Sequence, residues 1–297
     1  MSLTFRKLHP HFAAEVSPID LRQVTDSEAL LEIRAGMDEY ALLVFRNQHF
    51  TDEEHLAFAQ RLDGQLHTKT GISALQKNRL GNEALADVSN LNANGEVYQA
   101  ADRKRMYGLG NRLWHTDASF QDPPGRYSML FARVVPPVSA DTEYADMRAA
   151  YDRLSDAMKA RLEGLRVHHS IAHSRHVLGF EFSQTEQEIL KGAIHPLIRA
   201  LPRTGRKSLY IAAHASKIID WPIPEGRLLL LELIEHATRP ECVYRHSWQV
   251  GDLVIYDNRA TMHRARPYAD TTYRRELRRV TSLDVEYGIE QAGAAPH

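Results

Sequence analysis

Short apolar runs alternate with amphipathic segments along the chain, and this pattern predicts many short strands with helices between them. Runs that are fully apolar or alternate in polarity predict strands at 41–45, 85–91, 127–135, 243–248, 253–256 and 275–283. Helical periodicity predicts helices at 146–154, 156–165 and 225–237. Capping-box sequences at 25–28 and 51–54 predict two earlier helices. We expect the first of these to bury Leu30, Leu31, Ile33 and Met37.

Two segments, 65–84 and 100–113, fit neither period. Long irregular segments inside a compact domain are usually lids or binding loops, so we expect both to cover an active site. No internal repeat or low-complexity linker interrupts the chain, which predicts a single domain over residues 1–297. Many short strands with helices between them indicate a mainly β fold, a β-sandwich or jelly-roll barrel with helical insertions.

The composition argues against several classes of partner and site. Lys plus Arg number 37 against 38 for Asp plus Glu, so bulk charge favours neither nucleic acid nor an anionic membrane as a partner. Cys242 is the single cysteine, which excludes an intrachain disulfide and a Cys-rich zinc site. No apolar run approaches the length that spans a bilayer, and no apolar core follows a basic N-terminal segment. We therefore expect a soluble, cytoplasmic protein.

Three residues predict a metal centre. His115 and Asp117 are two positions apart, so on an extended segment both side chains point to one face. His263, far along the chain, can complete the site. Two imidazoles and one carboxylate form the facial triad of non-haem Fe(II) oxygenases, which leaves other coordination positions open. Zinc is the alternative metal, because it also binds histidine and carboxylate and can keep a position open.

The motifs around these residues resemble one protein family. His-x-Asp at 115–117 is followed in order by DTEYADMRAAY at 141–151, GDLVIYDNR at 251–259 and YRRELRR at 273–279. Together they resemble the taurine dioxygenase family of Fe(II)/2-oxoglutarate-dependent oxygenases, and within it the 2,4-dichlorophenoxyacetate dioxygenases, from about Leu8 to Leu283. The resemblance implies a double-stranded β-helix (jelly roll), Fe(II) as cofactor, 2-oxoglutarate as co-substrate, and O2.

The resemblance also assigns roles to the arginines. It implies that Arg275, assisted by Thr142, binds the distal carboxylate of 2-oxoglutarate, and that Arg279 binds the carboxylate of the prime substrate. Strand parity places Arg275 and Arg279 on one face. We expect the other face, with Arg274, Glu276 and Arg278, to be solvated. Lys69 corresponds to a basic substrate contact in related enzymes, or else it is an ordinary solvated lysine.

Other histidines are expected to be structural or surface residues, because none combines with a carboxylate in the family pattern. The chain has 16 histidines, so clusters arise by chance. The histidines set aside in this way are His168, His169, His173, His176, His214, His236 and His246.

The implied reaction is hydroxylation of an aryloxy-carboxylate beside its ether oxygen, which gives a phenol and glyoxylate, with succinate and CO2 from 2-oxoglutarate. A taurine or alkyl-sulfonate dioxygenase is the alternative within the family. A zinc hydrolase or a non-catalytic metal-binding jelly roll is the alternative from another class. The expected partner is a small aryl carboxylate, with neither nucleic acid nor membrane involved, and a homo-oligomer is left open. The cytoplasm suits this chemistry because it supplies ferrous iron and 2-oxoglutarate.

Overall fold

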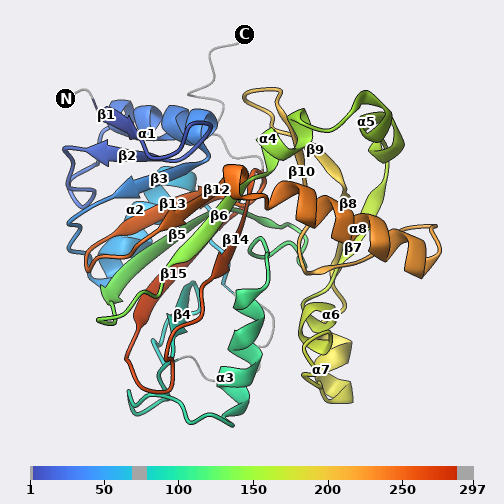
Figure 1. Cartoon of the computed structure of the whole chain (residues 1–297). Helices are drawn as coiled ribbons and strands as arrows, with labels where there is room; N and C mark the ends of the chain where they lie inside the picture. Colours follow the sequence, from blue (N-terminus) through green and yellow to red (C-terminus); the bar gives the residue numbers. More distant parts are fainter. Residues whose placement is uncertain (1–2, 69–78, 286–297) are drawn as a thin grey trace.

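The computed structural model describes residues 3–68 and 79–285, and its centre is a pair of β-sheets (Figure 1). The larger sheet has the strand order β1 (Thr4–Lys7), β2 (Ala14–Ser17), β3 (Leu42–Phe45), β13 (Leu253–Asp257), β5 (Gly125–Val134), β15 (Glu276–Leu283) and β4 (Leu85–Ser89). The smaller sheet consists of β12 (Val243–His246), β6 (Thr142–Asp146) and β14 (Thr261–Ala265). This is the predicted jelly roll with helical insertions.

The apolar runs are strands buried on both faces, which explains their lack of alternation. On β13, Leu253 and Ile255 belong to the core under the N-terminal helices, whereas Val254 and Tyr256 belong to the core between the two sheets. Tyr144 of β6 supplies the opposite side of that inter-sheet core. The period of two thus splits one apolar run between two cores.

Helices cover the outer faces of the sheets. The N-terminal helices α1 (Ser27–Tyr40) and α2 (Asp52–Asp63) pack on the larger sheet. On the other side, α4 (Met147–Asp152) and α8 (Ile223–Ala237) pack on the smaller sheet and on the strands β7 (Arg166–His169) and β11 (Ala215–Ile218). Further elements are α5 (Asp156–Leu162), α6 (Ile171–His176), α7 (Gln184–Ile189), η3 (Pro240–Cys242), β8 (Ala193–Pro196), β9 (Ile198–Ala200) and β10 (Lys207–Leu209).

The two predicted N-terminal helices exist, with one difference in capping. Thr51 and Glu54 form the predicted capping box of α2. The first helix begins one residue later than its motif implied, because the side chain of Asp26 accepts a hydrogen bond from the backbone of Ala29 and forms the N-cap. Leu30, Ile33 and Met37 are buried as expected, and Leu31 is half-buried.

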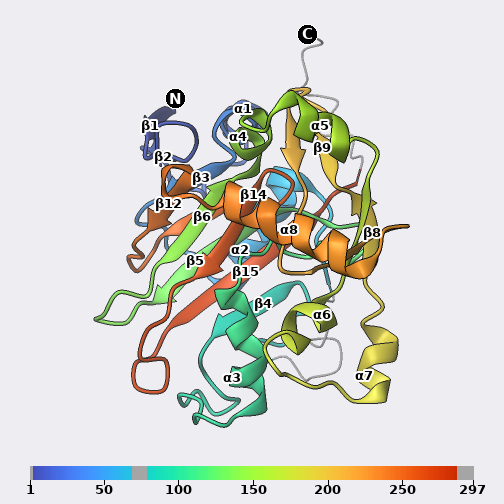
Figure 2. The same cartoon turned by 45° about the vertical axis from the view of Figure 1, so that its right-hand side comes forward.

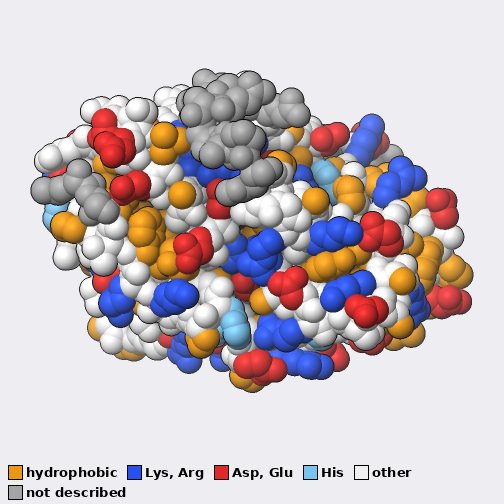
Figure 3. Space-filling model, turned by 90° about the horizontal axis from the view of Figure 1, so that it is seen from above, with side chains coloured by type: hydrophobic (Ala, Val, Ile, Leu, Met, Phe, Trp, Pro, Cys, Tyr) orange, Lys and Arg blue, Asp and Glu red, His pale blue; other side chains and the backbone are white. Residues whose placement is uncertain are grey.

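The prediction of an irregular segment at 100–113 is wrong. This segment contains α3 (Arg103–Gly108) and a 3-10 helix, η2 (Leu109–Arg112). Both are short and polar, so their helical period is not apparent in the sequence. In Figures 1 and 2, α3 lies in the lower part of the molecule, with β4 on one side and α6 on the other in Figure 1. The face shown in Figure 3 mixes basic and acidic side chains.

No helix within residues 3–68 and 79–285 is both long enough and apolar enough to cross a bilayer.

Arg148 forms a buried ion pair at the start of α4 and also links α4 to the end of α1. The guanidinium of Arg148 is fully buried, donates to both oxygens of Asp146 (3.0 and 3.1 Å), and also donates to the backbone carbonyls of Asp38 and Glu39. Arg148→Met would leave the Asp146 carboxylate buried without its counter-charge, so we expect the free energy of unfolding to fall by about 3–5 kcal/mol.

Urea denaturation of the metal-free protein measures this loss. Arg206→Met is the matched control, because it breaks the exposed Arg206–Asp152 pair. That pair should contribute about 1 kcal/mol or less. Equal losses in the two variants would contradict a special role for the buried pair.

Candidate metal centre

Backbone pairing brings the two predicted histidines together. His115 and His263 exchange reciprocal backbone hydrogen bonds of 2.9 and 2.7 Å, which form an isolated antiparallel bridge beside β14. Asn258, in the turn between β13 and β14, fixes the neighbouring segment. Its side-chain oxygen accepts from the backbone of Asp117 at 3.0 Å, and its carbonyl accepts from the hydroxyl of Thr116 at 2.7 Å. Residues 115–117 are therefore held against the strand that carries His263.

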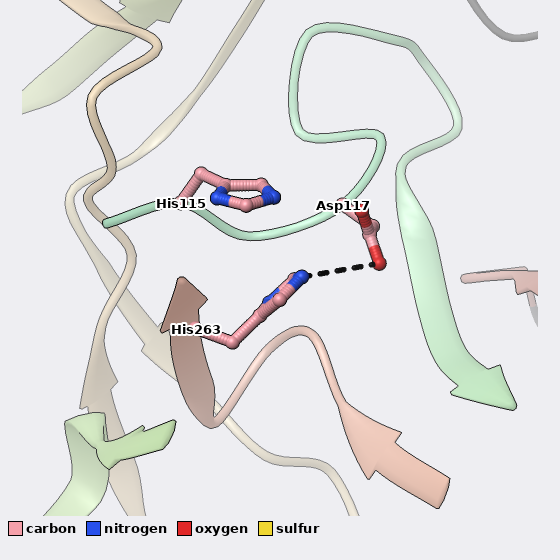
Figure 4. A group of neighbouring side chains, drawn as sticks. All are labelled: His115, Asp117 and His263. Carbon is pink, nitrogen blue, oxygen red and sulfur yellow. Dashed lines mark ion pairs between the residues drawn. The ribbon is translucent and has the colours of Figure 1, made fainter. Parts of the chain in front are cut away.

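The three predicted ligands form one buried group. One ligand atom from each of His115, Asp117 and His263 can be chosen so that all three lie within 4.8 Å of one another. In Figure 4 the three side chains point toward one space, and Nε2 of His263 lies 3.8 Å from Oδ2 of Asp117. Among residues 3–68 and 79–285, this is the one group of three or more such side chains with metal-binding geometry.

The protonation states suit a cation. Burial lowers the pKa of His115 to about 4, and burial followed by the proximity of His115 holds the pKa of His263 well below its ordinary value. Both imidazoles are therefore neutral at pH 7. Burial alone would raise the pKa of Asp117, but Arg279 and the two histidines outweigh it, and the pKa lies well below its usual range. Two neutral imidazoles and one carboxylate are the donor set that a ferrous ion takes.

Hydrogen bonds orient these groups as they do around protein-bound metals. Nδ1 of His115 donates to the carbonyl of Leu113 at 2.8 Å, which leaves the Nε2 lone pair free for a metal. Oδ2 of Asp117 accepts from the hydroxyls of Ser128 (2.8 Å) and Tyr256 (2.7 Å). The described residues fit Fe(II) in donor type, burial and supporting contacts.

Arg279 contacts the triad directly, which the sequence did not reveal. Its Nη1 donates to Oδ1 of Asp117 at 2.5 Å. Arg279 lies in the middle of β15, opposite Leu130 of β5, so the strand register aims its side chain at the metal centre. Its Nε is buried and has no hydrogen-bond partner within the described part of the chain.

A cavity of about 330 Å³ opens from the triad and contains most of the predicted site residues. Thr142, Arg275 and Arg279 line it together with the three candidate ligands. Lys69, the remaining predicted site residue, lies outside the described residues. Residues of α3 and η2 form one wall, so segment 100–113 does border the site although it is helical.

Arg275 and Thr142 lie beside Trp248. The indole Nε1 of Trp248 donates to Thr142 Oγ1 at 2.9 Å, and the guanidinium of Arg275 lies 6.0 Å from the centre of a Trp248 ring. Arg275 is 8% exposed, and no carboxylate among the described residues lies within 4.0 Å of it. Burial lowers its pKa. An anionic ligand would supply the missing counter-charge.

Arg274, the neighbour of Arg275, points away from the cavity, as parity predicted. Its side chain is 50% exposed and pairs with Glu276 at 2.9 Å. The expectation that Glu276 and Arg278 are also solvated is wrong. Both are buried, because the register of β15 with β4 brings Asp87 beside Arg278, and because Arg79 and Asp87 form ion pairs with Glu276 and Arg278.

Two cavity residues were not predicted from the sequence. His214, expected to be structural or on the surface, is 2% exposed, lines the cavity, and has its ring centre 5.8 Å from that of His115. It is not part of the metal-binding group. Arg175, on α6, lines the cavity and is 3% exposed. Neither residue belongs to a motif, so a single sequence carries no signal for them.

The chain is similar to dioxygenases over nearly its whole length. The family model described as "Taurine catabolism dioxygenase TauD, TfdA family" matches residues 4–281. An alpha-ketoglutarate-dependent 2,4-dichlorophenoxyacetate dioxygenase from Cupriavidus pinatubonensis is 46% identical over 96% of this chain and 99% of its own. An (S)-phenoxypropionate/alpha-ketoglutarate-dioxygenase from Sphingobium herbicidovorans is 36% identical over 89% of both chains.

One solved structure extends the likeness to three dimensions. It is a crystal structure of AAD-2 in complex with Mn(II) and N-oxalylglycine, and it matches with a TM-score of 0.92 and 44% identity. The match covers 96% of this chain and 99% of that one.

The triad leads to a prediction on metal binding. His263→Ala removes one nitrogen donor from the buried group, and we expect the Kd for Mn(II) to rise by more than about 100-fold, since loss of an outer-shell contact alone costs roughly 10- to 100-fold. Calorimetric titration with Mn(II) measures the change. His236→Gln is the control, because His236 bonds to the carbonyl of Ala150 outside the group. Unchanged Mn(II) affinity in His263→Ala would contradict the assignment.

Proposed function

The chain belongs to the taurine dioxygenase family (TauD, TfdA), and from this premise we propose that it hydroxylates aryloxy-carboxylates with Fe(II), 2-oxoglutarate and O2. The observation that carries the proposal is one cavity that contains both the candidate metal triad and Arg275, a buried cation with no carboxylate partner among the described residues. A metal alone would not need that cation, whereas a dicarboxylate co-substrate would.

Each residue has a proposed role. His115, Asp117 and His263 would hold Fe(II), which when bound supplies the oxidising chemistry that converts 2-oxoglutarate and O2 to succinate and CO2 as the substrate is hydroxylated. Arg275 would hold the distal carboxylate of 2-oxoglutarate by charge-assisted hydrogen bonds, with Thr142 as a second donor. Trp248 supports this role, because it donates to Thr142 Oγ1 and leaves the hydroxyl proton of Thr142 available.

Arg279 is proposed to contact the carboxylate of the prime substrate. Its Nη1 donates to Asp117, and its side chain lines the same cavity as the triad. A carboxylate held there keeps the adjacent carbon close to the triad. Hydroxylation of that carbon, between carboxylate and ether oxygen, gives a hemiacetal that collapses to a phenol and glyoxylate without a side-chain base.

Two relatives support an aryloxy substrate, since their names state 2,4-dichlorophenoxyacetate and (S)-phenoxypropionate as the compounds on which they act. A sulfonate or a sulfate ester is the second candidate, because two relatives at 29% identity are an alpha-ketoglutarate-dependent sulfonate dioxygenase from Saccharomyces cerevisiae and an alkylsulfatase from Acinetobacter baylyi. The proposed partner is in either case a small organic anion, and the proposed location is the cytoplasm, where 2-oxoglutarate is supplied.

The 2-oxoglutarate site is tested by comparing how substitutions of the adjacent residues Arg274 and Arg275 change the Kd for 2-oxoglutarate. Arg275→Lys loses the planar fork that binds a carboxylate through two bonds, so we expect the Kd for 2-oxoglutarate to rise by roughly 10- to 100-fold. Arg274→Ala should change it by less than about 3-fold, because the exposed Arg274–Glu276 pair contributes little. Calorimetry on the Mn(II)-loaded protein measures both. The reverse ranking would show that the strand face is wrongly assigned.

Substrate-dependent succinate formation tests the substrate class. We expect turnover with 2,4-dichlorophenoxyacetate and related aryloxyacetates, and poor turnover with their methyl esters, which lack the anionic carboxylate. Taurine and a C8 alkyl sulfate are the comparison compounds. If esters react as well as acids, or if taurine exceeds every aryl acid, the aryloxy-carboxylate proposal is wrong. Turnover without added 2-oxoglutarate would favour a hydrolase instead.

A further inference from the structure

The cavity beside the triad has more buried positive charge than the proposed roles use. Arg105 and Arg112 pair with Asp270, Arg266 lies beside Glu143, and Arg279 pairs with Asp117. Two cavity arginines, Arg175 and Arg275, are buried and lack a carboxylate partner within residues 3–68 and 79–285. The distal carboxylate of 2-oxoglutarate accounts for Arg275. Arg175 has no proposed counter-charge.

Neutral acceptors fix the position of Arg175 without neutralising it. Its Nε donates to the carbonyl of Tyr107 at 3.2 Å, Nη1 donates to Ser174 Oγ at 3.0 Å, and Nη2 donates to Asn111 Oδ1 at 3.0 Å. Each terminal nitrogen therefore retains one N–H with no partner in the part of the chain that the structure describes. A buried charge of this kind is costly unless a ligand of opposite charge pairs with it.

The packing of η2 also holds this guanidinium in place. A Cβ atom at Gly110 would lie 2.4 Å from Cζ of Arg175, so only a glycine allows the close approach. The guanidinium centre also lies over the ring of Tyr107, 4.8 Å from the ring centre. The side chain is therefore preorganised, which lowers the entropy lost when a ligand binds.

Arg175 is close to the triad. The hydroxyl of Ser174 donates to the carbonyl of Ile171 at 2.8 Å, so its oxygen accepts both from Arg175 and from Nδ1 of His214 (3.0 Å). The ring of His214 in turn lies 5.8 Å from that of His115. The neighbours of Arg175 differ from those of Arg275, which lies beside Trp248, so the two uncompensated cations occupy separate regions of one cavity.

We propose that Arg175 binds the carboxylate of the prime substrate, with Arg279 as a shared contact that also holds Asp117. This inference rests on the proposed function. If Arg279 alone bound the substrate, one guanidinium would serve two carboxylates while Arg175 stayed buried without a counter-charge. Binding to Arg175 resolves both problems and places the substrate anion on the α6 side of the triad, apart from the 2-oxoglutarate anchor.

A comparison of charged and neutral ligands tests the proposal. The protein is loaded with Mn(II) and N-oxalylglycine, so that no turnover occurs, and titrated calorimetrically with 2,4-dichlorophenoxyacetate and with 2,4-dichlorophenoxyacetamide. Wild type should prefer the acid. In Arg175→Met the acid should bind roughly 30-fold or more weakly, as for other buried charged pairs that lose one partner. The amide should change by less than about 3-fold, because it carries no charge for Arg175 to compensate.

The ratio of acid to amide affinity separates a charge contact from general damage, since a distorted cavity would weaken both ligands alike. Arg112→Met is the matched control: it also removes a cavity cation, but one already paired with Asp270, so the ratio should stay near the wild-type value. Gly110→Ala keeps the charge of Arg175 and displaces its guanidinium, so it should also lower the ratio. It replaces Arg175→Met if that variant does not fold.

The outcomes distinguish this inference from the proposed function. If wild type binds the acid and both Arg175→Met and Gly110→Ala retain the wild-type ratio, Arg175 is not the anchor, and the proposed substrate class stands. If wild type binds neither aryl ligand, the substrate class is wrong and the inference falls with it. A collapsed ratio in Arg112→Met as well would overturn the assignment to Arg175, because any cavity cation would then have the same effect.

Discussion

The reciprocal backbone hydrogen bonds between His115 and His263 are the contact on which the site depends. They join two distant segments of the chain, and because the two residues are directly paired, both imidazoles extend to the same side. Asn258, in the turn between β13 and β14, accepts hydrogen bonds from residues 116 and 117. These bonds place the carboxylate of Asp117 next to the two imidazole rings. A local His-x-Asp pair becomes a three-ligand group only through this pairing.

The two sheets of the jelly roll support the paired residues His115 and His263 and the neighbouring Asp117. The strand β14 lies in the smaller sheet, and β13 and β15 lie in the larger sheet whose inner face supplies Tyr256 and Arg279. Asp117 receives hydrogen bonds from both of these residues, so its carboxylate is supported from the larger sheet while His263 comes from the smaller one. The metal centre therefore lies where the two sheets meet, and any change in their separation would alter its geometry.

The sequence predicted those parts of the site that depend on local spacing. Parity along β15 separated Arg275 from Arg274, and the apolar run at 253–256 was predicted as a strand. Prediction from the sequence failed for residues whose burial depends on a distant segment of the chain. Glu276 and Arg278 are charged residues that any single-sequence argument places in solvent, but Asp87 of the neighbouring strand β4 pairs with Arg278, and Arg79 pairs with Glu276. The short helix α3 was missed because none of its six residues is buried, so no apolar period marks it in the sequence.

Arg175 marks the limit of sequence reasoning most clearly. An arginine in the last turn of a short helix is by itself an ordinary surface residue, favoured there by the helix dipole. It becomes a buried cation because η2 packs on it, and that packing depends on a glycine at position 110. Burying this charge without a carboxylate partner costs stability. The cavity that it lines has a volume of about 330 Å³, which lies at the small end of the range for ligand pockets. Arg175 and Arg275 lie among different neighbours in this small cavity, and each lacks a carboxylate partner among the described residues. This arrangement favours the binding of two small anions over the binding of one large ligand.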